Sequence, residues 1–284
     1  MTLNSYAKIN IFLEIHNRME NNYHSITSLF SEIELHDILK FSLTKNQEIN
    51  LLSNIENLEP NENLVYKIAI FIKTEFCVQC GALIELKKMI PISAGLGGGS
   101  SNGASTIKGL SKLWNLNLTN KQMHEIASEF GSDINFFIEG YQAIGTNRGE
   151  IIEPIEQSIF IDNILLINPG FAISSAEAYN LYSESAEKND ELNSLYLKEN
   201  IAKFQYPKSC FNRLEAVICK KYPEIQSAIE KLYKHGATKA ILSGSGPTMI
   251  GFFDNPYSLE NARKEFADMN FWTYKTSTRR RQKP

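Results

Sequence analysis

The 284-residue sequence has no apolar run of about 18 residues, so it predicts no membrane-spanning helix. Its first residues lack a positively charged segment followed by an apolar one, and we therefore expect no signal peptide. The formal net charge is only −3, which gives no general attraction for nucleic acid. These features predict a cytoplasmic protein that binds neither nucleic acid nor a membrane.

Cysteine is also scarce, with four residues in the chain. Cys77 and Cys80 form one C-x-x-C pair, but Cys210 and Cys219 are spaced too widely to complete a zinc-finger-like set. A disulfide-based fold is not expected at this length, so we expect reduced thiols. With 43% hydrophobic and 21% charged residues, the chain can build one large globular domain or two of ordinary size.

The most distinctive stretch is 91–104, which contains five glycines. It is too rich in glycine for the interior of a helix or strand, and it runs directly into apolar residues at helical spacing. Those residues are Ala104, Ile107, Leu110 and Leu113. A flexible loop that opens a helix directs backbone N–H groups and partial positive charge at one point, which favours phosphate binding. The hydroxyls of Ser100 and Ser101 can add hydrogen bonds or a Mg²⁺ ligand.

Two familiar phosphate-binding patterns do not fit this stretch. No Gly-Lys-Ser/Thr follows the glycines, which excludes the Walker pattern. The dinucleotide pattern fits only loosely, up to Ser100. The alternative is a flexible loop without a ligand, but the proline at its start, the apolar Leu96 and the immediate helix argue against it.

Strands and helices alternate through the first half of the chain. Periodicity predicts strands at 3–15, 32–43, 49–52, 82–87 and 141–146, and helices at 64–76, after the glycine stretch, and at 121–130. Asn63 is expected to cap the helix that follows it, and Thr119 the helix at 121–130. Gly131 should end that helix. Asp133 is therefore a candidate helix cap as well as a candidate functional carboxylate.

The second half predicts strands at 164–167, 240–242, 248–253 and 271–276. Helices are expected from Ser174 or Ser175 onward, at 209–219, at 224–235 and at 257–269. This alternation indicates an α+β sandwich of ferredoxin-like kind. Because composition changes near 150–157, we predict two domains, 1–154 and 155–284.

Two further groups of polar residues stand out. Lys8 and Asn10 share one face of the strand at 3–15, although a lysine on a strand is often simply solvated. Tyr23 and His24 lie at a loop edge, where they can stack on and hydrogen-bond to a planar ligand. The alternative is that Tyr23 packs against the protein and His24 is solvated.

Three segments now stand in order: Ala7-Lys8-Ile9-Asn10, residues 91–104, and Leu242-Ser243-Gly244-Ser245-Gly246. This order closely resembles the GHMP kinase superfamily, named for galactokinase, homoserine kinase, mevalonate kinase and phosphomevalonate kinase. The resemblance covers nearly the whole chain. It implies an α+β fold with two domains. These are an N-terminal domain of the ribosomal-protein-S5-domain-2-like kind and a C-terminal ferredoxin-like α/β sandwich.

Details of the sequence resemble one branch of that superfamily. They are Tyr23-His24 followed by Ser28-Leu29-Phe30, the triple glycine 97–99 before Ser100-Ser101-Asn102, and Gly131-Ser132-Asp133. The branch uses ATP to phosphorylate the 2-hydroxyl of a cytidine diphosphate derivative of methylerythritol. This is a step of the non-mevalonate (methylerythritol phosphate) route to isoprenoid and terpenoid precursors. The resemblance thus implies an ATP-dependent phosphotransferase with an alcohol acceptor, Mg²⁺ as cofactor, and a monomer or weak homodimer.

Two alternatives stay open. One is another small-molecule kinase of the superfamily, such as a homoserine or mevalonate kinase. The other is a non-catalytic nucleotide-binding homologue, since fold alone does not guarantee activity.

The resemblance also implies roles for single residues. Lys8 and Asp133 would be the catalytic pair, because a carboxylate can accept or orient the hydroxyl proton while a lysine offsets charge on the transferring group. The residues that would bind ATP are Asn63, Lys88, Pro91, Ile92, Ser93, Ala94, Gly95, Leu96, Gly97, Gly98, Gly99, Ser100 and Ser101. The residues that would bind the second substrate are Asn10, Tyr23, His24, Ser175, Tyr179, Gly244, Ser245 and Gly246. Metal ligands are not assigned.

Overall fold

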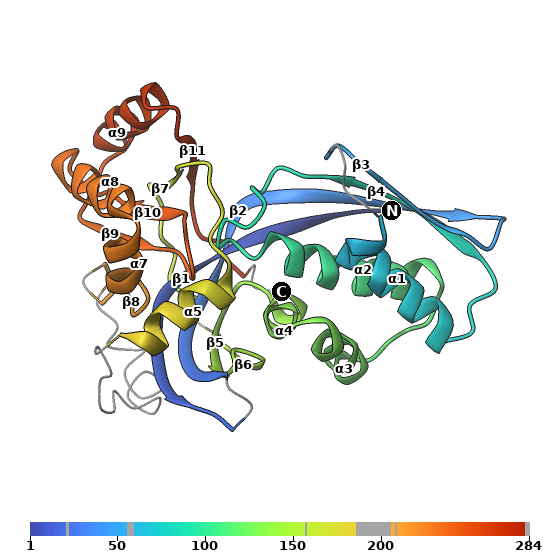
Figure 1. The fold of residues 1–284 in the computed structure, drawn as a ribbon. Coiled ribbons are helices and arrows are strands. Elements are labelled where there is room, and N and C mark those ends of the chain that lie inside the picture. The colour runs from blue at the N-terminus through green and yellow to red at the C-terminus, as the bar shows by residue number, and fades with distance from the viewer. Residues whose placement is uncertain (21–22, 56–59, 157, 186–205, 208, 282–284) are drawn as a thin grey trace. The chain divides into compact units, whose positions relative to one another are not determined.

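A computed structural model describes residues 1–20, 23–55, 60–156, 158–185, 206–207 and 209–281 (Figure 1). The chain forms two compact units. Unit 1 comprises Met1–Ala7, Leu35–Pro91 and Gly97–Gly140, and unit 2 comprises Lys8–Glu34, Ile92–Leu96 and Tyr141–Pro284. Each unit is therefore built from three separate stretches of sequence. The sequence-based division at residue 154 remains a prediction.

The elements confirm the expected α+β class. The strands are β1 (Thr2–Arg18), β2 (His24–Thr44), β3 (Ile49–Ser53), β4 (Gly81–Lys87), β5 (Gln142–Asn147), β6 (Ile151–Pro154), β7 (Ile164–Asn168), β8 (Phe211–Asn212), β9 (Lys239–Leu242), β10 (Met249–Phe252) and β11 (Trp272–Thr276). The helices are α1 (Leu64–Glu75), α2 (Gly98–Leu113), α3 (Asn120–Phe130), α4 (Ser132–Glu139), α5 (Ser175–Glu184), α7 (Glu215–Lys221), α8 (Pro223–Lys234) and α9 (Pro256–Asp268), with a short 3₁₀ turn, η1 (Pro60–Glu62).

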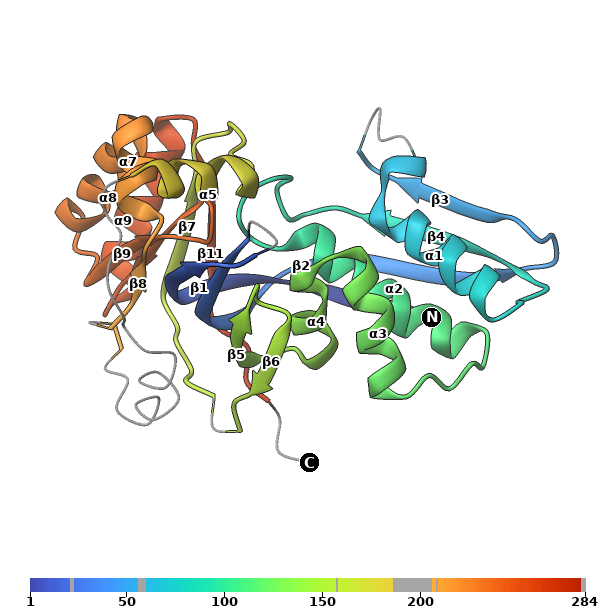
Figure 2. The ribbon, with the colours of Figure 1, turned by 60° about the horizontal axis from the view of Figure 1, so that its bottom comes forward.

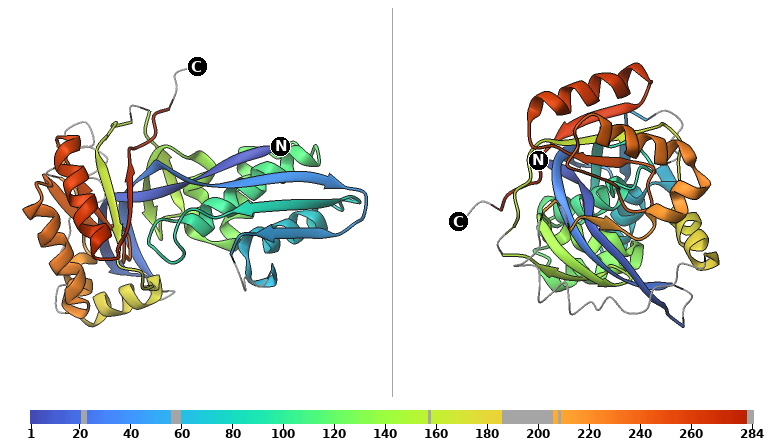
Figure 3. Two further views of the ribbon diagram at one scale, coloured as in Figure 1. Left: turned by 90° about the horizontal axis from the view of Figure 1, so that it is seen from above. Right: turned by 90° about the vertical axis from the view of Figure 1, so that its left-hand side faces the viewer.

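Unit 1 is a layer of strands covered by helices. The second half of β2 pairs antiparallel with β4, from Ile38 opposite Lys87 to Thr44 opposite Gly81, and β3 pairs parallel with β4. Helices α1–α4 lie on one face of these strands (Figures 1 and 3). Helix α2 approaches the strands closely, since a Cβ at Gly109 would lie 2.5 Å from the ring of Phe41. Only glycine lets the helix pack this tightly.

Unit 2 contains an antiparallel sheet in the order β11-β7-β10-β9. Helices α8 and α9 cover it (Figure 2). The buried core beneath them includes Leu165, Ile167, Leu232 and Phe266. Leu13 and Ile15 of β1 and Ile26 of β2 belong to the same core, so residues from the start of the chain complete it.

Several sequence-based boundaries are corrected. The strand expected from residue 32 begins at His24, because residues 26–31 pair with β5. The helix expected at 209–219 was wrong in its first half. Phe211–Asn212 forms β8, which pairs with Phe12 and Leu13 of β1, and α7 starts only at Glu215. A local helical pattern is overridden there by long-range backbone pairing. The strand β6, paired with β5, was not predicted.

All four cysteines are free. Cys77 is exposed, whereas Cys210 and Cys219 are buried, and burial raises the pKa of each of these two thiols to about 12. Within the described part of the chain, no helix is both long and apolar enough to cross a membrane.

Candidate functional site

The second half of the glycine stretch forms the start of α2. Gly97 is the N-cap, with a left-handed φ of 67°, which favours glycine. Among the described residues, no side chain caps this helix. The first amide N–H groups of α2 are therefore not taken by a capping side chain, and the helix dipole adds positive potential at the same place. This arrangement suits a phosphate group.

The glycine that follows, Gly98, is tightly constrained on one side. A Cβ at Gly98 would lie 2.9 Å from Ile90 Cγ2 and 3.1 Å from Lys88 Nζ, so a larger residue would displace one of them. Gly99 is exposed and Ser100 is half-buried. Ser101 is buried, and its hydroxyl accepts a hydrogen bond from Ser5 at 2.8 Å. Ser100 is thus the more accessible of the two predicted hydroxyl ligands.

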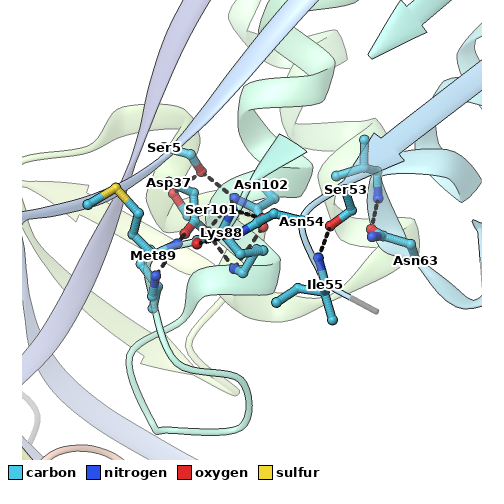
Figure 4. Close-up of polar contacts among 12 residues, drawn as sticks. Ser5, Asp37, Ser53, Asn54, Ile55, Asn63, Lys88, Met89, Ser101 and Asn102 are labelled. Atoms are coloured by element: carbon cyan, nitrogen blue, oxygen red, sulfur yellow. Dashed lines mark hydrogen bonds and ion pairs between the residues drawn. The ribbon is translucent and has the colours of Figure 1, made fainter. Parts of the chain in front are cut away.

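Lys88 is held in a polar cluster beside this helix start (Figure 4). Its Nζ donates to Asp37 Oδ2 and, at 3.1 Å, to Asn102 Oδ1. Its backbone is fixed as well, because its N–H donates to Asn54 Oδ1 at 2.7 Å and its carbonyl accepts from Asn54 Nδ2 at 3.2 Å. The sequence did not single out Asp37. A signal was nevertheless present, since Asp37 falls on the apolar face of the alternating strand with Leu35 and Leu39.

Asn63 caps α1 as predicted. Its Oδ1 accepts from Val65 N at 2.9 Å, and its backbone is extended as an N-cap requires (Figure 4). Its second predicted role, at ATP, stays a prediction.

Asp133 lies in the first turn of α4 and is half-exposed. The N-cap of this helix is Gly131 and not Asp133, and no side-chain capping bond forms there among the described residues. The capping alternative is therefore wrong. A carboxylate in the first turn is favoured by the helix dipole. Helix α4 packs against α2, the helix that starts at the glycine stretch.

Lys8 is buried rather than solvated. Its Nζ donates to Asn10 Oδ1 at 2.7 Å and lies 5.3 Å from the centre of the Phe30 ring. Asn10 Nδ2 in turn donates to Ser28 Oγ at 2.7 Å. The backbone N–H of Lys8 donates to the carbonyl of Leu96 at 2.9 Å, which ties β1 to the glycine stretch within unit 2.

The third motif, the segment 242–246, packs against these residues. A Cβ at Gly244 would lie 3.1 Å from Asn10 Oδ1 and 3.5 Å from Lys8 Nζ, and the φ of 56° also favours glycine. Ser243 Oγ donates to the carbonyl of Gly95 at 3.2 Å. Unit 2 thus brings the first motif, the centre of the glycine stretch and the third motif together.

Two residues that support this turn were missed. Asn212 is buried and donates to the carbonyls of Leu242 and Gly244, both at 2.8 Å. Glu215 accepts from Leu242 N at 2.7 Å. Burial raises the pKa of Glu215, and the bond from Leu242 acts in the opposite direction. Both residues fall in the segment whose pattern predicted a helix, so their contacts with the turn could not be inferred from spacing.

The aromatic residues form a separate group in unit 2. The rings of His24 and Tyr179 are stacked, with centroids 5.9 Å apart and an interplanar angle of 19°. Tyr182 meets His24 edge-on at 5.7 Å. Tyr23 is 60% exposed, with the Arg148 guanidinium 5.4 Å from its ring centre. His24 is therefore not a simply solvated histidine.

The two residues of α5 that are predicted to bind the substrate, Ser175 and Tyr179, contact different parts of unit 2. Tyr179 contacts His24, whereas the Ser175 hydroxyl lies 3.3 Å from that of Ser245 in the third motif. Both are within unit 2. Lys8 belongs to unit 2 and Asp133 to unit 1, and their pairing stays a prediction.

Comparison with known proteins gives matches along most of the chain. Residues 63–141 match the family model for the GHMP kinases N terminal domain, and residues 196–270 match that for the GHMP kinases C terminal. A protein of Caldanaerobacter subterraneus subsp. tengcongensis is 37% identical, over 92% of this chain and 91% of its own. One of Thermodesulfovibrio yellowstonii is 37% identical over 94% of both chains. Both are named 4-diphosphocytidyl-2-C-methyl-D-erythritol kinase.

Solved structures share the fold. The crystal structure of a 4-(cytidine 5'-diphospho)-2C-methyl-D-erythritol kinase superposes with a TM-score of 0.82 and 24% identity, covering 99% of this chain and all of that one. The mevalonate kinase of Methanococcus jannaschii superposes with a TM-score of 0.74 and 16% identity, over 99% of this chain and 98% of its own. At these identities the similarity establishes the fold alone.

Proposed function

Because this chain belongs to the GHMP kinases, in the family of the 4-diphosphocytidyl-2-C-methyl-D-erythritol kinases, we propose that it transfers a phosphoryl group from ATP to the 2-hydroxyl of 4-diphosphocytidyl-2-C-methyl-D-erythritol. This reaction is a step of the methylerythritol phosphate route to isoprenoid precursors. We expect the enzyme to act in the cytoplasm, as a monomer or weak homodimer.

The single observation that carries the proposal is the start of α2. Gly97 opens the helix in a left-handed conformation, and its first-turn amides carry no side-chain cap among the described residues. Such a helix start binds phosphate without a positively charged side chain. In our proposal residues 91–101 surround the phosphates of ATP, with Asn63 also contacting the nucleotide. Lys88 is considered separately below.

Two residues are proposed to act on the reacting groups. The carboxylate of Asp133 accepts the proton of the attacking hydroxyl or orients that hydroxyl. The ammonium of Lys8 offsets the negative charge of the transferring phosphoryl group. The support from the structure is that Lys8 is fixed by Asn10 in a buried position and that Asp133 lies in the first turn of α4, which packs against α2.

The cytidine end of the substrate is assigned to the aromatic group of unit 2. Tyr23 and Tyr179 are proposed to stack on the base, and His24 to hydrogen-bond to its edge. Stacking of a base on an aromatic side chain contributes roughly 1–3 kcal/mol. Because His24 stacks on Tyr179 in this structure, the base would take the place of one ring contact when it binds. The other groups proposed to hold the substrate are Asn10, Ser175, Gly244, Ser245 and Gly246.

Mg²⁺ is proposed to bind together with ATP. Mg²⁺ prefers oxygen ligands and is usually held by one or two carboxylates together with substrate phosphates. Within the described residues no group of three or more His, Cys, Asp or Glu side chains could hold a metal by itself, which fits an ion that arrives with the nucleotide. Ser100 and Asp133 are oxygen donors on α2 and α4, two helices that pack together. The ion would neutralise charge on the phosphates.

The test is ADP release from MgATP by the purified protein with a panel of acceptors. The panel contains 4-diphosphocytidyl-2-C-methyl-D-erythritol, mevalonate, homoserine and galactose. We expect turnover with the cytidine compound alone. Turnover with another acceptor would retain the kinase activity and reject the cytidine site, and nucleotide binding without turnover on any acceptor would favour a non-catalytic homologue.

A further inference from the structure

Asp37 occupies a position that no functional assignment above explains. Its side chain is fully buried, with no exposed surface. It lies on β2 next to Ile38, whose pairing with Lys87 ends the ladder between β2 and β4. The carboxylate therefore sits where the chain leaves β4 and enters the glycine stretch.

All the acceptor positions of this carboxylate are used by groups around the glycine stretch. Oδ1 accepts from the backbone N–H groups of Met89 at 2.6 Å and Ile90 at 2.8 Å. Oδ2 accepts from Lys88 Nζ and, at 2.9 Å, from Asn102 Nδ2 (Figure 4). An ionised carboxylate offers about four lone-pair sites, so four donors satisfy it.

These donors lie at both ends of the stretch. Residues 88–90 immediately precede it, and Asn102 lies near its end, in α2. Asn102 Nδ2 also donates to Ser5 Oγ at 2.9 Å. One carboxylate therefore joins the last residues before the stretch to the helix in which the stretch ends, and both ends are fixed relative to each other.

Lys88 is placed to complete this connection rather than to reach outward. Its side chain is only 9% exposed. Its ammonium lies 3.1 Å from where a Cβ of Gly98 would stand, at the positive end of the α2 dipole. A cation is unfavourable there unless an anion balances it, and Asp37 provides that charge.

We propose that Asp37 is a positioning residue for the nucleotide, because it holds both ends of the glycine stretch. In this proposal Lys88 affects ATP binding through its ion pair with Asp37 and does not bind the phosphates directly. The inference rests on the proposed use of ATP. It differs from that proposal because it concerns how the loop is held and not which acceptor is phosphorylated.

The first test is the variant Asp37→Asn. Whichever way the amide faces, its NH₂ group meets two of the donors that the carboxylate accepted, and the charge that balances Lys88 is lost. We expect the dissociation constant of a non-hydrolysable ATP analogue, measured by calorimetry without acceptor, to rise about tenfold or more. The KM for the acceptor should stay unchanged. An unchanged affinity for the analogue overturns the inference.

The chain offers a matched control. Lys40 and Glu85 form an ion pair at 2.8 Å across the same two strands, but their side chains are 55% and 42% exposed. Exposed pairs contribute little. Glu85→Gln should therefore leave the affinity for the analogue at the wild-type value. An equal loss in Glu85→Gln and Asp37→Asn would mean a general effect of charge on the sheet, and would reject the specific role.

A double-mutant cycle separates the two possible actions of Lys88. If the lysine acts through Asp37, Lys88→Met weakens binding of the analogue, and the double variant Asp37→Asn/Lys88→Met is no weaker than the weaker single variant. If the lysine binds the phosphates directly, the losses of binding free energy in the two single variants add in the double variant, and the inference is wrong.

If Asp37→Asn fails to fold, amide hydrogen exchange measured in Lys88→Met still tests the inference. In Lys88→Met the amides of Met89 and Ile90 should exchange faster than in the wild type, together with weaker binding of the analogue. Weaker binding with unchanged exchange would mean direct contact between lysine and nucleotide, against the inference. Wild-type protein that binds the analogue but phosphorylates no cytidine acceptor would reject the proposed function and leave this test intact.

Discussion

Lys8 illustrates how burial changes the role of a charged residue. Moving an ammonium group out of water costs free energy unless polar partners replace the lost hydration. Asn10 Oδ1 is one such partner, the Phe30 ring is another, and Ser28 holds the amide of Asn10 in turn. A lysine that served only for solubility would need none of these contacts.

The role of Asp133 is tested by Asp133→Asn. The amide keeps the size of the side chain but cannot accept the hydroxyl proton, so we expect turnover to fall by roughly 10²–10⁴ if the carboxylate is the base. Affinities for ATP and acceptor should stay within a few-fold. The measurement is steady-state kinetics, with Glu129→Gln, an exposed carboxylate on α3, as the control. Near-normal turnover in Asp133→Asn would exclude the catalytic role.

The stacking role of Tyr179 is tested by Tyr179→Ala. Losing the ring removes the proposed contact with the base, which corresponds to roughly tenfold or more in the KM for the cytidine substrate. The KM for ATP should not change, because α5 supplies none of the proposed ATP contacts. Equal losses for both substrates would show that Tyr179 is structural, through its packing with His24.

Glu215 gives a pH dependence of stability. Burial raises its pKa in the folded protein above the ordinary value of 4.5, so the folded state holds this proton to higher pH than the unfolded state does. The free energy that the protonated Glu215 side chain contributes to folding is fully present below pH 4.5. It is lost as pH rises through the raised pKa of the folded state. Glu215→Gln removes the titration, and its side-chain oxygen can still accept from Leu242. As pH rises above 4.5, the urea midpoint of Glu215→Gln should therefore increase relative to the urea midpoint of the wild type. A difference between the two midpoints that does not change with pH would contradict this.

Asn63, at the start of α1, has two predicted roles, capping the helix and contacting ATP, and two substitutions distinguish them. Asn63→Ala removes the cap and should lower the free energy of unfolding by about 1 kcal/mol. Asn63→Asp keeps an accepting oxygen and the cap, but lacks the amide donor. If Asn63 also contacts ATP through that donor, Asn63→Asp weakens ATP binding without loss of stability. Calorimetric titration and urea unfolding measure the two effects, and an Asn63→Asp variant equal to wild type in both would leave capping as its role.

The elements that sequence predicted well are those specified locally. Asn63 and the periodic apolar residues after it define α1, and the glycines define where α2 can begin. The strand β8 was missed because only Phe12 and Leu13, about 200 residues earlier, define it. Periodicity within a segment carries no information about such a partner.

The candidate site was predictable to a similar extent. The residues of the three motifs were found from their resemblance, and the structure groups Lys8, Asn10 and Gly244. Asp37 and Asn212 were not found, because each acts on the backbone of a distant turn or loop. Lys88 was assigned from sequence to ATP, and its burial against Asp37 could be seen only in three dimensions.

At the scale of the whole molecule, the division of the chain can be tested by cutting it after residue 154. Leu13, Ile15 and Ile26 are buried in one core with Leu165 and Ile167, so the cut separates parts of a single core. We expect neither fragment, 1–154 or 155–284, to show a cooperative thermal transition like that of the full chain. Circular dichroism melting curves measure this. Two independent cooperative transitions would instead support the sequence-based division.

The way the chain alternates between its two units also bears on recombination between relatives. The chain passes from one unit to the other after Ala7, Glu34, Pro91, Leu96 and Gly140. A single crossover between residues 8 and 140 would therefore divide both units between two parents, and one after Gly140 would divide unit 2. Chimaeras that keep each core from one parent need breakpoints at all five positions, one pair of them only five residues apart within the glycine stretch. Exchange of the whole gene therefore keeps both units from one parent, whereas exchange of one half divides at least one unit between two parents.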